Sequence, residues 1–126
     1  MTRILCVEDS DDNLYMLHRR LSRAGFDVKV SSNGAEGVEW AKTLKPDLIV
    51  MDLNLPGMDG LQLTRWMKDD ATTRDIPILA VTAYALDGDA DIARDAGCSG
   101  YVAKPYDPAV LVQEAKRLLN ETRTDP

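Results

Sequence analysis

The chain has 126 residues, with 21 acidic and 15 basic side chains and a formal net charge of −6 at pH 7. This length, with 44% apolar and 29% charged residues, predicts one globular domain with a buried core and excludes a second folded domain. The acidic balance argues against a nucleic-acid-binding protein, which needs a basic surface.

The first part of the chain predicts two strands, each followed by a helix. An apolar run at 4–7 lacks polar alternation, as buried strands do. Leucines at helical spacing follow it and stop at Gly25, a residue that favours the left-handed end of a helix. Residues 26–31 alternate apolar and polar side chains, which predicts a strand at a sheet edge. Asn33 can cap a second helix, which must end before Pro46.

The rest of the chain continues the alternation of strand and helix. Further apolar runs predict buried strands at 48–51, 78–81 and 101–103. Aspartate caps are expected to open the three remaining helices at Asp59, Asp87 and Asp107. Trp40 and Trp66 are expected to be packing residues on the second and third helices.

Strand and helix therefore alternate five times along the sequence. This order predicts an α/β fold with a doubly wound, five-stranded parallel sheet, covered on both faces by helices through right-handed crossovers. We expect the domain to span 1–121 and residues 122–126 to form a frayed tail.

The cysteines and the apolar runs indicate the cellular compartment of the protein. Cys6 and Cys98 are too few for a disulfide framework and match no metal or redox spacing, which favours a reducing, cytoplasmic location. The run at 4–7 is too short for a signal peptide or a membrane span, so we expect no membrane association. His18 is the one histidine, which excludes a multi-histidine metal site.

Polar side chains follow the buried strands, at the sheet edge where open parallel sheets bind ligands. They are Glu8 and Asp9 after the first run, then Asp52, Thr82 and Lys104. Most of them have an ordinary structural interpretation when taken singly, because aspartate after a strand is a common helix cap. Asp52 is harder to explain in this way, since a carboxylate that closes a buried strand is costly unless something compensates it.

Carboxylates that lie together repel one another unless a cation lies among them. Mg²⁺ fits best, because it takes one or two carboxylates and leaves positions for phosphate oxygens. An aspartate beside such an ion, with a lysine and a hydroxyl opposite, can act as a nucleophile toward a phosphoryl group. Asp11 and Asp12 either strengthen the field that attracts the ion or cap the first helix.

Four segments together carry a family resemblance: 7–10, 51–60, 81–83 and 100–105. In this order, at the ends of the predicted strands, they resemble the receiver domain of two-component response regulators over essentially the whole chain. The resemblance implies a CheY-like sheet with the strand order 2-1-3-4-5. The segment 82–89 resembles single-domain regulators of the DivK type more than transcription factors.

The resemblance also implies roles for individual residues. Asp52 would accept a phosphoryl group from a histidine kinase or a histidine phosphotransfer protein. Asp9, Asp52 and the backbone carbonyl of Asn54 would hold Mg²⁺, and Glu8 would reach the ion through water. Lys104 would pair with the phosphoryl group.

A conformational switch and a docking surface are implied as well. Thr82 would move toward the phosphoryl group and Tyr101 would turn inward, although by itself Tyr101 is an ordinary strand aromatic. Tyr15, Arg19 and Pro105 would dock the phosphodonor, whereas the spacing of the two α-helical residues is equally compatible with a solvated face.

The family resemblance leaves the output of the protein open. It could act on a partner protein or return phosphate to a relay, as a monomer or as a phosphorylation-dependent dimer. Two further positions, Asn54 and Tyr84, modulate the phosphoryl lifetime in the family, and a bulky Tyr84 could shield the group from water.

The main alternative is a phosphatase of the haloacid dehalogenase type, which also forms an aspartyl-phosphate with Mg²⁺. Its mechanism needs a second aspartate two residues after the nucleophile, and here that position is Asn54. The chain is also too short for the usual core and cap of these enzymes. We therefore expect no enzyme activity beyond the protein's own phosphorylation and dephosphorylation. The complete set of site residues argues against a degenerate receiver.

Overall fold

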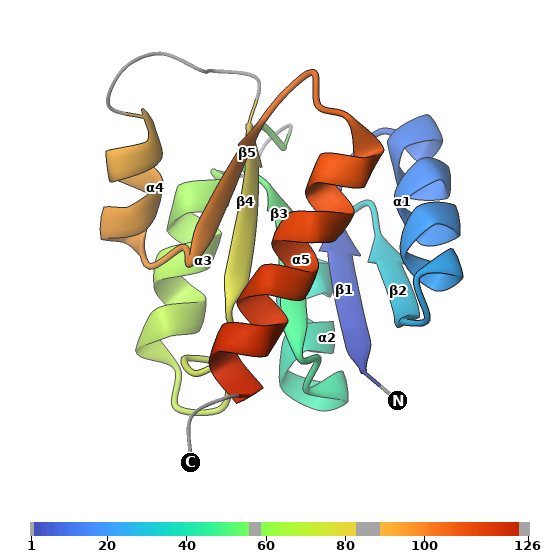
Figure 1. Ribbon diagram of the computed structural model, residues 1–126. Coiled ribbons are helices and arrows are strands. Elements are labelled where there is room, and N and C mark those ends of the chain that lie inside the picture. The colour runs from blue at the N-terminus through green and yellow to red at the C-terminus, as the bar shows by residue number, and fades with distance from the viewer. Residues whose placement is uncertain (1, 56–58, 83–88, 124–126) are drawn as a thin grey trace.

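The computed structural model describes residues 2–55, 59–82 and 89–123. Strands and helices alternate along this part of the chain (Figure 1). The strands are β1 (Arg3–Val7), β2 (Asp27–Ser31), β3 (Leu48–Asp52), β4 (Ile78–Thr82) and β5 (Gly100–Ala103). The helices are α1 (Asp11–Arg23), α2 (Gly34–Leu44), α3 (Gly60–Asp69), α4 (Asp89–Ala96) and α5 (Pro108–Arg123).

The strands form one parallel sheet in the order β2-β1-β3-β4-β5, which confirms the predicted fold. The alternating segment, β2, lies at an edge, as its pattern predicted. In the centre of the sheet, Asp52 of β3 pairs in register with Val81 of β4, and Thr82 pairs with Ala103 of β5. This register brings the carboxyl ends of the three strands to one level.

The sheet separates two apolar cores. Successive residues of a strand point to opposite faces, so Ile4 and Cys6 of β1 enter one core while Leu5 and Val7 enter the other. The first core is closed by α1 and α5, and the second by α2, α3 and α4. Figure 1 shows this arrangement, with α5 (red) in front of the sheet and α2 behind it.

The residues at the two ends of α1 explain where this helix begins and ends. Ser10 caps α1, because its hydroxyl accepts a hydrogen bond from the backbone N–H of Asn13 at 3.3 Å. The acids Asp11 and Asp12 therefore lie in the first turn of α1 and do not cap it. Gly25 follows α1 with φ of 99°, the left-handed conformation that its position predicted.

Most of the other predicted caps are confirmed. The side chains of Asn33, Asp59 and Asp107 accept hydrogen bonds from backbone N–H groups in the first turns of α2, α3 and α5. The predicted cap Asp87 lies outside the described residues. At the other end of the chain, α5 continues to Arg123, two residues beyond the predicted domain boundary, and the rest of the predicted tail, 124–126, lies outside the described residues.

Candidate functional site

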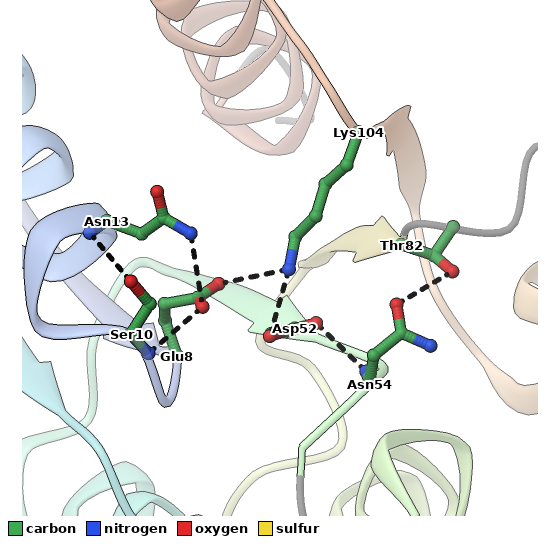
Figure 2. Close-up of polar contacts among 7 residues, drawn as sticks. All are labelled: Glu8, Ser10, Asn13, Asp52, Asn54, Thr82 and Lys104. Atoms are coloured by element: carbon green, nitrogen blue, oxygen red, sulfur yellow. Dashed lines mark hydrogen bonds and ion pairs between the residues drawn. The ribbon is translucent and has the colours of Figure 1, made fainter.

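The predicted site residues come together at the carboxyl edge of the sheet. Glu8 follows β1, Asp52 and Thr82 are the last residues of β3 and β4, and Lys104 follows β5. Figure 2 shows Glu8 and Lys104 converging on Asp52, while the side chain of Thr82 meets that of Asn54. The sequence prediction that four separate segments meet here is therefore confirmed.

Three carboxylates form one cluster at this edge. Glu8, Asp9 and Asp52 each offer an oxygen, and these atoms lie within 4.8 Å of one another. Glu8 and Asp52 are almost fully buried, whereas Asp9 is exposed and so opens the cluster to solvent. Carboxylate oxygens on one open side of a pocket are the donor set that Mg²⁺ binds, with its remaining positions left to water and phosphate.

The ammonium group of Lys104 compensates the two buried acids. Its Nζ lies 3.1 Å from Oδ2 of Asp52 and 3.5 Å from Oε2 of Glu8. Burial acts to lower the pKa of Lys104, but the hydrogen bond to Asp52 and the charges of both acids outweigh it, so this pKa is raised. Lys104 is therefore a permanent cation within the site.

Glu8 is held on its other side by the start of α1. Its Oε1 accepts hydrogen bonds from the backbone N–H of Ser10 at 3.2 Å and from the amide group of Asn13 at 3.4 Å. Burial, followed by the charge of Asp52, raises the pKa of Glu8, although Lys104 and the Ser10 N–H act in the opposite direction. This buried acid is thus fixed in orientation by Ser10 and Asn13, two groups that the sequence prediction did not include. Ser10 and Asn13 could have been found from the sequence, because both lie at the start of the helix that follows β1.

Asn54 links the phosphoacceptor candidate to the predicted switch residue. Its backbone N–H donates to Oδ1 of Asp52 at 2.9 Å, and its side-chain Oδ1 accepts a hydrogen bond from the hydroxyl of Thr82 at 3.2 Å. The family resemblance implies for Asn54 a backbone ligand role and an effect on phosphoryl lifetime. The hydrogen bond between the Asn54 side chain and Thr82 was not predicted.

The start of α3 lies directly against the loop that carries these residues. A Cβ atom on Gly60 would lie 2.5 Å from the Cα of Leu53 and 2.8 Å from the backbone oxygen of Asp52. Real Cβ contacts are never this short, so only glycine allows α3 to begin this close to Asp52.

The predicted docking residues are accessible. Tyr15 is 69% exposed on α1, and Arg19 and Pro105 are also exposed. Pro105 lines a groove beside the carboxylate cluster, whereas the other two residues do not; the full lining is Asn13, Met16, Lys104, Pro105 and Tyr106.

Two aromatic residues complete the description of the site. Tyr106 was not predicted, and burial, followed by the negative charge of Glu8, raises its pKa to about 12. Tyr101 is partly buried against the second core. The predicted lifetime residue Tyr84 lies outside the described residues.

Comparison with known protein families gives one match over most of the chain. Residues 4–116 match the model of the response regulator receiver domain. The polar-differentiation response regulator DivK of Brucella anthropi is 36% identical over 118 residues, which are 94% of this chain and 96% of that protein. The DivK protein of Brucella ovis is 35% identical over the same shares of both chains.

Solved structures show the same fold. A CheY-like receiver domain protein from Methanospirillum hungatei superimposes with a TM-score of 0.91 at 25% identity, covering 100% of this chain and 99% of that one. The receiver domain of a sensor histidine kinase from Pseudomonas aeruginosa is 34% identical, with a TM-score of 0.85 and coverage of 94% and 98%. That structure contains a magnesium ion coordinated in its active-site cleft.

Within the described residues, every helix is too short or too polar to cross a membrane.

Proposed function

Because the chain belongs to the family of response regulator receiver domains, we propose that Asp52 is its phosphoacceptor and that the groups around Asp52 perform and read out the transfer. Members of this family are signalling proteins of two-component systems and are phosphorylated on an aspartate in the presence of Mg²⁺. The observation that carries the assignment is the burial of Asp52 at the end of β3, within reach of Lys104 and two further acids.

The geometry around Asp52 suits nucleophilic attack. One carboxylate oxygen accepts from the Asn54 N–H and the other contacts the Lys104 ammonium, so the carboxylate is held in one orientation. In the transfer, a carboxylate oxygen attacks phosphorus while the bond to the donor imidazole breaks and its electrons return to the ring. Lys104, which now pairs with Asp52, then pairs with the phosphoryl oxygens.

The residues proposed to hold Mg²⁺ are Asp9, Asp52 and the backbone carbonyl of Asn54, with Glu8 acting through water. When bound, the ion neutralises charge on the transferring phosphoryl oxygens. The support from this chain is its three-carboxylate cluster. Ser10 and Asn13 orient Glu8 for this role through their hydrogen bonds.

The switch begins at Thr82. Its hydroxyl donates to Asn54 in the structure, and in the phosphorylated protein it donates to a phosphoryl oxygen instead. Tyr101 on β5 turns inward in response. Phosphorylation thereby favours one of two arrangements of α4, β5 and α5, through its differential contacts with them.

The phosphodonor docks next to the site. A histidine kinase or histidine phosphotransfer protein would contact Tyr15, Arg19 and Pro105, and the groove at Met16 and Tyr106 offers an apolar seat between α1 and the β5–α5 connection. The downstream partner is either a protein that recognises the switched surface or the phosphotransfer protein itself.

No catalysis beyond the protein's own phosphorylation and dephosphorylation is proposed. A phosphatase of the haloacid dehalogenase type needs an acid where this chain has Asn54, whose side-chain oxygen accepts the Thr82 hydroxyl. An amide has no proton of suitable acidity to give to a leaving group.

Acetyl phosphate with Mg²⁺ tests the acceptor directly, with intact-mass measurement of acid-labile phosphate. The parent protein is expected to gain one phosphoryl group, and Asp52→Asn to gain none. Asp95→Asn, the same change at an exposed position of α4, serves as the matched control and should behave like the parent. Equal labelling of Asp52→Asn, or no labelling of the parent, contradicts the proposal.

A further inference from the structure

A second groove lies between α2 and α3, away from the phosphoacceptor. It is lined by Val38, Lys42, Trp66, Met67, Asp69, Asp70 and Ala71, and we call it the α2–α3 groove. Its α3 residues belong to the last turn of the helix and its exit, whereas Asp52 lies at the first turn, beside Gly60. At 1.5 Å per residue, about 9 Å of helix separate Gly60 from Trp66, the nearest α3 residue of the groove.

Trp66 lines this groove, and its side chain is half exposed. Trp66 was expected to be a packing residue, which is wrong: it is 52% exposed, while Leu63 and Met67 of the same helix are 1% exposed. Trp40 does pack against the second core. Tryptophan carries a large apolar surface and is most favourable when covered. The indole N–H of Trp66 has no hydrogen-bond partner among the described residues.

Two carboxylates line the groove, Asp69 and Asp70, and they differ in whether they form an ion pair. Lys42 pairs with Asp70 at 3.4 Å, and Asp70 also accepts hydrogen bonds from the backbone and hydroxyl of Thr72 at 2.9 and 2.7 Å. These hydrogen bonds, followed by the charge of Lys42, hold the pKa of Asp70 below its ordinary value. Asp69 is exposed and forms no ion pair within the described part of the chain, even with Arg65 one turn earlier.

A half-exposed aromatic ring beside an unpaired carboxylate is complementary to a planar cation. An arginine guanidinium can stack on the face of Trp66 and donate hydrogen bonds to Asp69, and it sheds water more readily than a lysine ammonium. The partly buried Val38 and the side chain of Met67 offer an apolar floor for a neighbouring aliphatic side chain.

We infer that the α2–α3 groove docks a segment of a partner protein that presents an arginine next to an aliphatic residue. The groove is formed by α2 and α3, outside the α4, β5 and α5 elements that phosphorylation is proposed to rearrange. Docking here is therefore independent of phosphorylation, and it tethers a partner in both states of the protein. The docking site itself is inferred from the groove alone, whereas its independence from phosphorylation rests on the proposed function.

The probe for this inference is the capped dipeptide acetyl-leucyl-arginine amide, titrated while the indole N–H resonance of Trp66 is followed by NMR. Comparison with the spectrum of Trp66→Phe assigns that resonance. We expect a saturable shift, and a dissociation constant that is unchanged when beryllofluoride and Mg²⁺ occupy the phosphoacceptor site. The matched probe acetyl-leucyl-citrulline amide keeps the planar shape without the charge, and we expect it to bind more weakly.

Two variants separate this groove from nonspecific attraction to an acidic protein. Asp69→Asn is expected to weaken binding of the arginine probe by up to about fivefold, the upper end of the range for an exposed ion pair, whereas Asp95→Asn on α4 is expected to leave it unchanged. Trp66→Ala lacks the indole, so its binding is followed through the backbone amide resonances of α2 and α3; it is expected to abolish saturable binding without unfolding the chain, because the Trp66 side chain is half exposed.

Four results would overturn the inference. They are no saturable shift with the arginine probe, equal binding of the citrulline probe, equal effects of Asp69→Asn and Asp95→Asn, and full binding by Trp66→Ala. Binding that requires beryllofluoride would overturn the independence from phosphorylation.

Discussion

In the proposed cycle, the hydroxyl of Thr82 exchanges its hydrogen bond with Asn54 for one with the phosphoryl group. In the structure it donates to Oδ1 of Asn54 at 3.2 Å, and in the activated protein it donates to the phosphoryl group. The first hydrogen bond therefore opposes activation. Such a bond contributes about 1 kcal/mol, so it shifts the balance between the two states about fivefold.

Asn54→Ala is accordingly expected to bind beryllofluoride about fivefold more tightly than the parent, because the hydrogen bond between Thr82 and the Asn54 side chain no longer has to break. Binding can be followed by NMR at fixed Mg²⁺, since the backbone carbonyl proposed as an ion ligand is retained. Thr82→Val supplies the control: in that background the Asn54 substitution should change affinity little. The same gain in both backgrounds would show that Asn54 acts by another route.

The thiol of Cys6 makes stability depend on alkaline pH. Burial, followed by the charge of Glu8, raises its pKa from 9.0 to about 12, so the folded protein keeps this proton when the unfolded chain has lost it. Its contribution to stability is complete below pH 9 and decreases as pH rises toward 12, by about 1.4 kcal/mol per pH unit. The sign follows from the larger number of protons bound by the folded state.

Urea unfolding between pH 7 and 10.5 should therefore show a steeper loss of stability above pH 9 in the parent than in Cys6→Ala. Other groups with raised pKa values, such as Tyr106 and Lys104, are present in both proteins, so the difference between the two profiles isolates Cys6. Parallel profiles would mean that the Cys6 thiol ionises equally easily in the folded and unfolded chain.

At the scale of the element, the first turn of α3 is as much a part of the site as the strands. Gly60→Ala would place a Cβ against the backbone of Leu53 and Asp52, neither of which can yield without moving the acceptor loop. We expect a net destabilisation of about 1–3 kcal/mol, even though alanine favours the helix by about 1 kcal/mol. Phosphorylation by acetyl phosphate should slow as well.

Gly37→Ala in α2 is the comparison for this substitution. Its added Cβ would meet the side chain of Val7, 2.7 Å away, and no backbone atom of the site. Thermal unfolding is expected to detect both changes, whereas the phosphorylation rate should fall only for Gly60→Ala. A normal phosphorylation rate in Gly60→Ala would show that phosphoryl transfer does not depend on the position of α3.

The elements show which signals in a sequence can be trusted. Caps and stops rest on local backbone chemistry, and Asn33, Asp59, Asp107 and Gly25 all act as their positions predicted. Trp66 was misassigned because helical spacing places a residue on a face but does not say whether a neighbouring element covers that face.

For the whole molecule, alternation of strands and helices was sufficient to predict a parallel sheet, and the family resemblance supplied its strand order. The convergence of Asp52, Thr82 and Lys104 followed from the rule that ligands bind at the carboxyl edge. The hydrogen bonds of Ser10 and Asn13 to Glu8, and of Thr82 to Asn54, could not be predicted. They depend on rotamers and on distances between loops, which no local pattern encodes.

The proposed metal site at the acidic cluster would couple the stability of the whole fold to divalent ions. An ion that binds only the folded protein raises its free energy of unfolding, by about 1.4 kcal/mol at ten times its dissociation constant. Added Mg²⁺ is therefore expected to raise the melting temperature of the parent, and to raise that of Asp9→Asn less, because Asp9 contributes a ligand to the cluster.

Asp12→Asn provides the matched control, since Asp12 is exposed in the first turn of α1 and lies outside the cluster. It should keep the full Mg²⁺ effect in differential scanning fluorimetry, and potassium chloride at equal ionic strength should not reproduce that effect. If Asp9→Asn and the parent respond equally, the ion does not bind at this cluster.

The division of the apolar interior by the sheet has a consequence for how such a protein can diverge. The residues of the two cores form separate sets, one shared with α1 and α5 and the other with α2, α3 and α4. A substitution on one side is therefore compensated mainly by neighbours on that same side. After a gene duplication, a copy of this chain could alter the docking proposed for α2 and α3 while α1 keeps the surface proposed for the phosphodonor, so that a new branch of a pathway would arise without loss of the old input.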